Sequence, residues 1–169
     1  MATLYTIPPF QRAWALFITN VSKRESHLSV VKDILKGYDE IVLCSGWMKM
    51  CGLSEILPLI DEALARNAKV SIYTNAEHTQ ASCVSAFSQR MGVTHSNVKN
   101  PYLHAKLYYG RTRDSFVAMT GSANVTAGGL WKNEEFSQLT YGGVRDPVHA
   151  PLEAYLKKLS RLGIAQPVA

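Results

Sequence analysis

Residues 102–110 read Tyr102-Leu-His-Ala-Lys-Leu-Tyr-Tyr-Gly110, an apolar and aromatic run that contains two polar side chains. Alternate residues of a β-strand point to the same face. We therefore predict a strand in which the imidazole of His104 and the ammonium of Lys106 point the same way, while Ala105 and Leu107 face a core. This pattern places a possible nucleophile or acid–base group beside a cation.

A second polar cluster follows the next apolar run. Residues 116–119 read as a strand, and the small residues of Gly121-Ser-Ala-Asn124 come directly after it. Small residues allow a tight turn or a close approach of the backbone to a ligand. Ser122 supplies a hydroxyl there and Asn124 an amide. A nucleophile, a cation and neutral donors that converge at strand ends suit an anionic phosphoryl centre.

The remaining pattern predicts an α/β domain with a mostly parallel or mixed sheet flanked by helices. We expect strands at residues 41–44, 69–73, 93–94 and 134–141. Helical patterns cover residues 27–36, after a possible N-cap at Ser26, and residues 56–66, 78–91 and 152–159. Residues 1–12 carry two prolines and are expected to form an arm or edge segment. Residues 14–18 form either a first strand or a surface segment used in assembly.

The composition indicates one globular domain, residues 1–169, that favours polyanions. Hydrophobic residues make up 47% of the chain and charged residues 18%, as in globular rather than disordered proteins. The net charge of +5 favours nucleic acid first and anionic lipid headgroups second. No apolar run approaches the ~20 residues that span a bilayer, and the first residues lack the pattern of a signal peptide. We expect no stable membrane association.

The three cysteines, Cys44, Cys51 and Cys83, are an odd number without the spacing of metal ligands. We interpret them as reduced thiols of a cytoplasmic protein. Cys44 and Cys51 are close enough in sequence to approach each other, although nothing in the spacing requires it. No cluster in the sequence predicts a metal site, and no cofactor is expected.

The two polar clusters together, His104-Ala-Lys106 and Gly121-Ser-Ala-Asn124, resemble the active-site signature of the phospholipase D superfamily. That superfamily includes phospholipases, cardiolipin-type hydrolases, small bacterial endonucleases and some restriction enzymes. The resemblance implies a phospholipase D-like fold and phosphodiesterase activity. The fuller motif has an aspartate where this chain has Arg111, and the nearest acid is Asp114.

A carboxylate follows in Asn133-Glu-Glu135. The spacing of His, Lys, Asn and Glu is similar to that in the nuclease domain of metal-independent restriction endonucleases of the superfamily. The resemblance implies that Glu135 belongs to the site and hydrogen bonds the inner nitrogen of His104. Adjacent Glu134 is an alternative for that role.

The resemblance also implies two copies of the His, Lys and Asn set, whereas this chain contains one His-x-Lys. A homodimer with one shared site follows. One His104 would form a phosphohistidine, and the other would act as general acid and base. Lys106 and Asn124 would stabilise the phosphoryl oxygens, with Ser122 as a further donor. No metal is required.

Four further residues are candidates for substrate binding. Trp47 and Lys49 follow the expected strand at 41–44, and ligands gather at the carboxyl ends of such strands. An ordinary loop with Trp47 packed on the core is the alternative. Arg111 and Lys132 flank the motif, as do further arginines, and are candidates for contacts with backbone phosphates.

Three hypotheses for the function remain. The first is an endonuclease of low sequence preference, with DNA favoured over RNA, in keeping with the short chain and its positive charge. The second is a lipid phosphodiesterase, such as a phospholipase or a cardiolipin-type hydrolase. The third is a catalytically silent module that keeps the fold and binds nucleic acid. The sequence does not distinguish single-stranded from double-stranded substrates.

Overall fold

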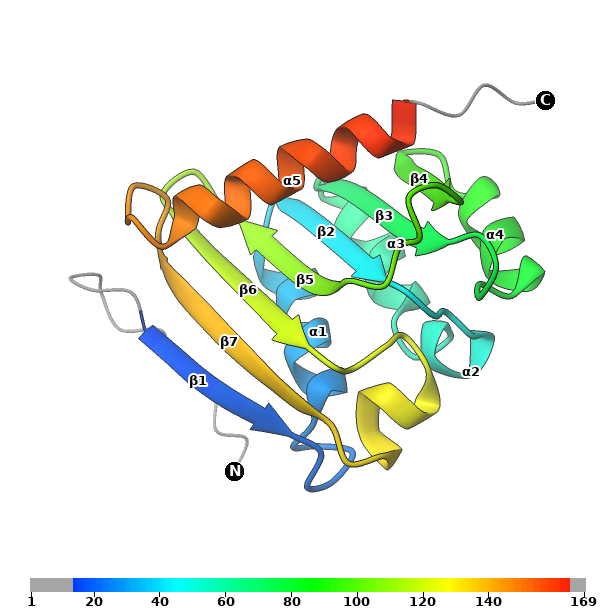
Figure 1. The fold of residues 1–169 in the computed structure, drawn as a ribbon, viewed down its shortest axis with the longest axis horizontal. Helices are drawn as coiled ribbons and strands as arrows, with labels where there is room; N and C mark the ends of the chain where they lie inside the picture. The colour runs from blue at the N-terminus through cyan, green and yellow to red at the C-terminus, as the bar shows by residue number, and fades with distance from the viewer. Residues whose placement is uncertain (1–13, 165–169) are drawn as a thin grey trace.

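The computed structural model describes residues 14–164, which form a seven-stranded sheet with helices on both faces (Figure 1). The arm expected at residues 1–12 lies outside the described residues. The strand order is β1-β7-β6-β5-β2-β3-β4. The strands are β1 (Trp14–Thr19), β2 (Glu40–Ser45), β3 (Lys69–Asn75), β4 (Val93–Val98), β5 (Lys106–Arg111), β6 (Ser115–Gly121) and β7 (Phe136–Gly143). The helices are α1 (His27–Gly37), α2 (Met50–Leu53), α3 (Leu57–Ala65), α4 (Ala81–Ser88), the π-helix η1 (Gly128–Lys132) and α5 (His149–Ile164).

The sheet is mixed, as expected, and its parallel part is confined to β2, β3 and β4. Parallel neighbours need a crossover connection, and α2, α3 and α4 supply those crossovers. β5 and β6 are joined by residues 112–114 alone, a connection that suits antiparallel strands. β5, β6, β7 and β1 accordingly pair antiparallel. The parallel arrangement therefore ends where the alternation of strands and helices ends in the sequence.

The predicted helices are present. α1 begins directly after Ser26, the predicted N-cap, and buries Leu28, Val31 and Leu35. The helices expected at residues 56–66 and 78–91 correspond to α3 and α4, and α4 is the shorter of the two. The first residues of the predicted helix lie outside α4, since His78 belongs to a turn and Thr79 forms an isolated β-bridge with Met48.

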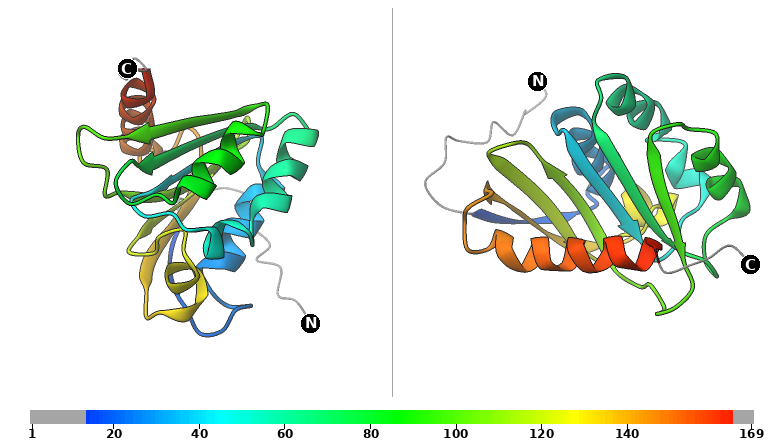
Figure 2. Two further views of the ribbon diagram at one scale, coloured as in Figure 1. Left: turned by 90° about the vertical axis from the view of Figure 1, so that its right-hand side faces the viewer. Right: turned by 90° about the horizontal axis from the view of Figure 1, so that it is seen from above.

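Two hydrophobic layers cover the two faces of the sheet. α1, α3 and α4 lie on one face and α5 on the other (Figure 2). Leu107 faces the layer beneath α5, as predicted for the core side of β5. Tyr108 points to the opposite face and is also buried, and its hydroxyl donates a hydrogen bond to the carbonyl of Ala123 at 2.8 Å. Both faces of β5 are therefore packed, which fixes the strand that carries Lys106.

Residues 14–18 form an edge strand, so the first of the two interpretations is confirmed. β1 pairs antiparallel with β7, with Thr19 opposite Phe136. Ile18 packs against the layer formed by α1 and α3, so Phe17 points to the other face. Phe17 is 66% exposed and Phe136 58% exposed, and their rings stack with centroids 5.1 Å apart.

The register of the central strands brings the polar clusters together. Ser45 at the end of β2 lies opposite Lys106 at the start of β5, and Leu107 lies opposite Thr120 near the end of β6. The carboxyl ends of β2 and β6 thus meet the amino end of β5 at one edge of the sheet. Arg111 lies at the other end of β5, opposite Glu40.

Candidate active site

The pair formed by His104 and Lys106 lies at the start of β5. The ammonium nitrogen of Lys106 is 3.1 Å from Nε2 of His104 and donates to the His104 carbonyl at 2.7 Å. The two side chains meet as predicted, but His104 lies just before β5 and not within it. The reason is the register: β2 ends at Ser45, opposite Lys106, so the backbone at His104 has no partner in β2.

Gly46 permits the chain to turn away at that point. A Cβ at Gly46 would lie 3.1 Å from the Cα of His104 and 3.2 Å from the carbonyl oxygen of Leu103. The segment that carries the imidazole is thus packed directly against the backbone that follows β2. His104 itself is exposed, so the imidazole is accessible to a substrate.

Asn124 is fixed by hydrogen bonds to its side-chain oxygen. The backbone N–H of Trp47 donates to Oδ1 at 2.9 Å, and the Ser45 hydroxyl lies 3.3 Å from the same atom. Ser45 also accepts from the backbone N–H of Val125 at 2.9 Å. Because the backbone N–H of Trp47 donates to Oδ1 of Asn124, this atom is the oxygen of the amide. The amide nitrogen Nδ2 is then the atom that can donate to a substrate.

Ser122 and Glu135 form a second pair at the end of β6. The Ser122 hydroxyl donates to Oε2 of Glu135 and accepts from the backbone N–H of Phe136 at 3.1 Å. Glu135 therefore accepts a hydrogen bond from Ser122 in this chain, and not the expected one from the inner nitrogen of His104. The cause is the pairing of β6 with β7, which places Gly121 opposite Ser137. Ser122, which follows Gly121, is thereby held next to Glu135 and Phe136, which precede Ser137. Glu134 is exposed.

The pKa values of two side chains near the site are shifted. The pKa of Lys106 is lowered, because burial outweighs the opposing effect of the Glu135 carboxylate. Burial raises the pKa of the Cys44 thiol to about 12. Cys44 therefore stays protonated near neutral pH and does not compete with His104 as a nucleophile.

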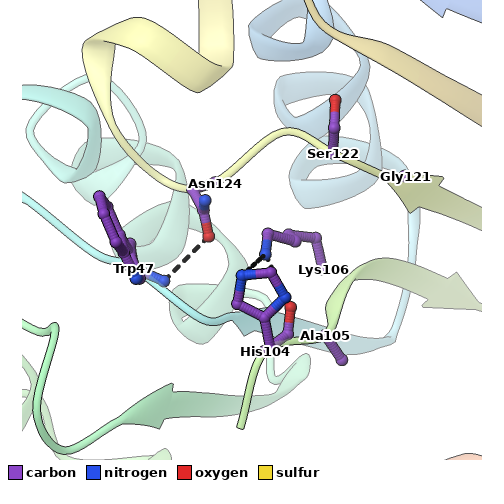
Figure 3. A pocket seen from close by; sticks show the side chains of 7 residues that line it. All are labelled: Trp47, His104, Ala105, Lys106, Gly121, Ser122 and Asn124. Carbon is purple, nitrogen blue, oxygen red and sulfur yellow. Dashed lines mark hydrogen bonds between the residues drawn. The ribbon is translucent and has the colours of Figure 1, made fainter.

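These residues surround an open pocket of about 400 Å³ (Figure 3). The lining residues are Trp47, His104, Ala105, Lys106, Gly121, Ser122 and Asn124. Five of the residues that the sequence singles out are thus brought together. Trp47 is 43% exposed and lines the pocket, a position that favours contact with a substrate over a role in packing on the core alone. Within residues 14–164, no three His, Cys, Asp or Glu side chains are grouped so that they could hold a metal ion.

The structure places the other three binding candidates outside the pocket lining. Arg111 is the clearest correction: its Nε lies 3.6 Å from a carboxylate oxygen of Glu40 at the far end of β5. It lies five positions after Lys106 along the strand, about 16 Å away at the usual rise. Lys49 and Lys132 are exposed. The backbone N–H of Lys49 donates to Val125 at 2.9 Å, and Lys132 ends η1.

Two side chains beside the pocket were not identified from the sequence. The ring of His78 lies 5.0 Å from that of Trp47 and 5.7 Å from that of Tyr102, measured between centroids. Tyr102 in turn stacks with His104 at 6.3 Å. Neither Tyr102 nor His78 belongs to the polar motif that the sequence singles out. The position of Tyr102 two residues before His104 was the signal that they share a face.

Comparison with protein-family models and with curated protein sequences finds no match. Solved structures do match. NucT from Helicobacter pylori has a TM-score of 0.71 at 14% identity, covering 89% of this chain and 97% of that one. Nuc from Salmonella typhimurium, described as a phospholipase D family member, has a TM-score of 0.69 at 15% identity, covering 90% and 97%.

A third match is the phosphatidylserine synthase of Haemophilus influenzae, with a TM-score of 0.61 at 14% identity, covering 89% of this chain and 38% of that one. At these identities the likeness concerns the fold. The phospholipase D-like fold, which the motif resemblance implied, is confirmed.

Proposed function

We propose that the protein is a metal-independent phosphodiesterase, an endonuclease of low sequence preference that cleaves DNA in preference to RNA. The observation that carries the proposal is the convergence of His104, Lys106 and Asn124 at one open pocket on a phospholipase D-like fold. A net charge of +5 supports a polyanionic substrate. Lys49 and Lys132, exposed at the same end of the sheet, are proposed contacts for the phosphates outside the pocket.

In the proposed reaction, a nitrogen of His104 attacks phosphorus and the bond to the leaving oxygen breaks. The phosphoryl group is then held on the imidazole. Lys106 lies 3.1 Å from Nε2, so a phosphoryl oxygen on that nitrogen comes within its reach. Charge that builds on the oxygens is stabilised by the Lys106 ammonium and by Nδ2 of Asn124.

Both halves of the reaction need a second acid–base group, which we assign to His104 of a second copy. It protonates the leaving oxygen, then takes a proton from a water molecule whose oxygen attacks phosphorus and breaks the P–N bond. Two observations support a homodimer. The chain contains one His-x-Lys, and Phe17 and Phe136 form an exposed apolar pair next to Glu135. A second copy that covers this pair would bring two pockets near one two-fold axis.

Glu135 is assigned an indirect role. It holds the hydroxyl of Ser122, which lines the pocket, and its charge favours the protonated form of Lys106. Ser122 then serves as a further donor to a phosphate oxygen. The three cysteines are free, which supports a cytoplasmic protein.

A lipid phosphodiesterase is the second candidate, favoured by the exposed aromatic rings of Trp47 and Tyr102 at the pocket. Among the described residues, no helix is both long and apolar enough to span a bilayer. A silent binding module is the third candidate, and the presence of His104, Lys106 and Asn124 in one pocket argues against it.

The test is cleavage of plasmid DNA in excess EDTA, with His104→Ala as the matched variant. Cleavage by the parent protein alone supports a metal-independent nuclease. Cleavage that EDTA abolishes contradicts the proposed chemistry. If neither protein cleaves DNA or RNA, hydrolysis of phosphatidylglycerol vesicles would support the lipid hypothesis. Binding of DNA without hydrolysis of any diester would support the silent module.

A further inference from the structure

We infer that Trp47, His78 and Tyr102 form a stacking platform for an unpaired nucleobase beside His104, so that the substrate is single-stranded nucleic acid. This inference rests on the proposed nuclease function and specifies its substrate class. The platform consists of these three side chains, and none of them belongs to the polar motif.

The three rings form a continuous row that ends at the reactive imidazole. Adjacent centroids are 5.0 Å apart from Trp47 to His78 and 5.7 Å apart from His78 to Tyr102, and 6.3 Å separate Tyr102 from His104. The rings of Trp47 and His78 are tilted by 34°, those of His78 and Tyr102 meet edge to face at 76°, and the planes of Tyr102 and His104 differ by only 24°. A phosphate held at His104 would thus have an aromatic surface within the span of one nucleotide.

The row is built from three separate segments that are tied to one another. Trp47 follows β2, His78 follows β3, and Tyr102 precedes β5. The backbone N–H of Met48 donates to the carbonyl of His78 at 3.4 Å. The side-chain amide of Asn75, which is buried at the end of β3, donates to the carbonyl of Leu103 at 3.0 Å. These bonds fix the platform before a ligand binds, which lowers the entropic cost of binding.

The rings at the two ends of the platform are not needed for the core. Trp47 is 43% exposed and Tyr102 is 51% exposed. Large aromatic faces left in water beside a phosphate-binding pocket are suited to stacking with bases, and every base has a π-face. Lys49 and Lys99 are exposed in the segments that follow β2 and β4, so cations for the neighbouring phosphates lie on the same side.

That the substrate is single-stranded follows from the geometry of base stacking. In a duplex both faces of a base are covered by its neighbours, so a protein ring reaches a base face only where the base is unpaired or splayed out. Stacking itself does not distinguish ribose from deoxyribose. The shared ligand chemistry is therefore an unpaired nucleobase attached to a phosphodiester, and both DNA and RNA must be tested.

The experiment compares two ligands that carry equal charge. A short fluorescent oligothymidylate and an abasic oligomer of the same length have the same phosphates, but the second has no bases. Binding is measured by fluorescence anisotropy on the His104→Ala protein, which does not consume the ligand, and oligouridylate provides the RNA comparison. We expect the abasic oligomer to bind about 5- to 150-fold more weakly, the range for the loss of one stacked base.

The platform variants are made in the same His104→Ala background. We expect the additional change Tyr102→Ala to weaken oligothymidylate and leave the abasic oligomer close to its former affinity, so that the preference shrinks. Tyr102→Phe keeps the ring and should keep the preference. Because Tyr102 is half exposed, its truncation leaves the core intact, and circular dichroism verifies that the fold persists.

The possible outcomes separate this inference from the proposed function. Equal affinity for the two oligomers overturns the platform, even if the parent protein cleaves DNA. A preference for bases that Tyr102→Ala removes supports the platform, even if the parent protein cleaves no nucleic acid, in which case only the proposed activity fails. Binding of phosphatidylglycerol vesicles that depends on Tyr102, without binding of either oligomer, overturns the platform in favour of a lipid surface.

Discussion

Replacing Ser45 with alanine should weaken both the fold and the site, because this hydroxyl links β2 to the segment that carries Asn124. Ser45 is buried at the end of β2. Its hydroxyl donates to the carbonyl of Trp47 at 2.6 Å and accepts from the backbone N–H of Val125 at 2.9 Å. It also lies 3.3 Å from Oδ1 of Asn124.

The expected loss is set by the buried amide of Val125. In Ser45→Ala that N–H loses its acceptor, and an unsatisfied buried donor costs about 1–3 kcal/mol of unfolding free energy. A domain of this size loses about 2–4 °C in Tm per kcal/mol, so we expect a decrease of about 2–12 °C. Asn124 keeps the hydrogen bond from Trp47 at 2.9 Å, so the activity should fall by less than in His104→Ala.

The assay combines urea unfolding with the rate of oligonucleotide cleavage. Ser88→Ala is the matched control, because Ser88 is exposed on α4 and its hydroxyl donates only within that helix among the hydrogen bonds of the described residues. We expect the control to stay within about 0.5 kcal/mol of the parent. If Ser45→Ala matches this control in both measurements, the proposed link between β2 and Asn124 is refuted.

Three further predictions address the charges and the surface around the site. Glu135→Gln removes a carboxylate that raises the pKa of Lys106, so this pKa should fall. Lys106 then loses its proton at a lower pH, and the alkaline limb of the pH–rate profile should move to lower pH. An alkaline limb that stays in place would show that Glu135 does not act on Lys106. Arg111→Ala should change the cleavage rate less than about tenfold, because Arg111 pairs with Glu40 at the far end of β5. A larger loss of the rate would show that Arg111 acts at the site. Phe17→Glu places a charge in the exposed pair with Phe136 and should give a monomer in light scattering with a large loss of cleavage, whereas an intact dimer would locate the interface elsewhere.

The sequence predicts the polar core of the site well because spacing determines it. His104 and Lys106 are two residues apart in an extended segment, and Gly121-Ser-Ala-Asn124 directly follows an apolar strand. Residues at such positions converge whenever the two strands are neighbours, and β5 and β6 are neighbours. The helices were predictable for the same reason, since their apolar periodicity is local.

The remaining features depend on register and on contacts between distant segments. That β5 starts at Lys106 follows from the end of its partner β2 at Ser45, which no local pattern reveals. The hydrogen bond between Ser122 and Glu135 depends on the pairing of β6 with β7. The predicted strands and helices leave residues 128–132 unassigned, and there η1 winds from Gly128 to Lys132.

The platform of aromatic rings could not be predicted from the sequence either, because its members are far apart in the chain. Trp47, His78 and Tyr102 come from three segments that the parallel pairing of β2 with β3 and the antiparallel pairing of β2 with β5 bring to one edge. Each ring alone is consistent with ordinary packing. Only their exposure and mutual distances indicate a binding surface.

The central claim is that His104 forms the covalent intermediate without a metal ion. Its most direct test is peptide mass spectrometry of protein quenched during cleavage of an oligonucleotide in excess EDTA. We expect a nucleotide phosphate attached to the peptide that contains His104, labile in acid as a phosphoramidate is, and absent from His104→Ala. An adduct on another residue, or cleavage by His104→Ala at the rate of the parent protein, would contradict the claim.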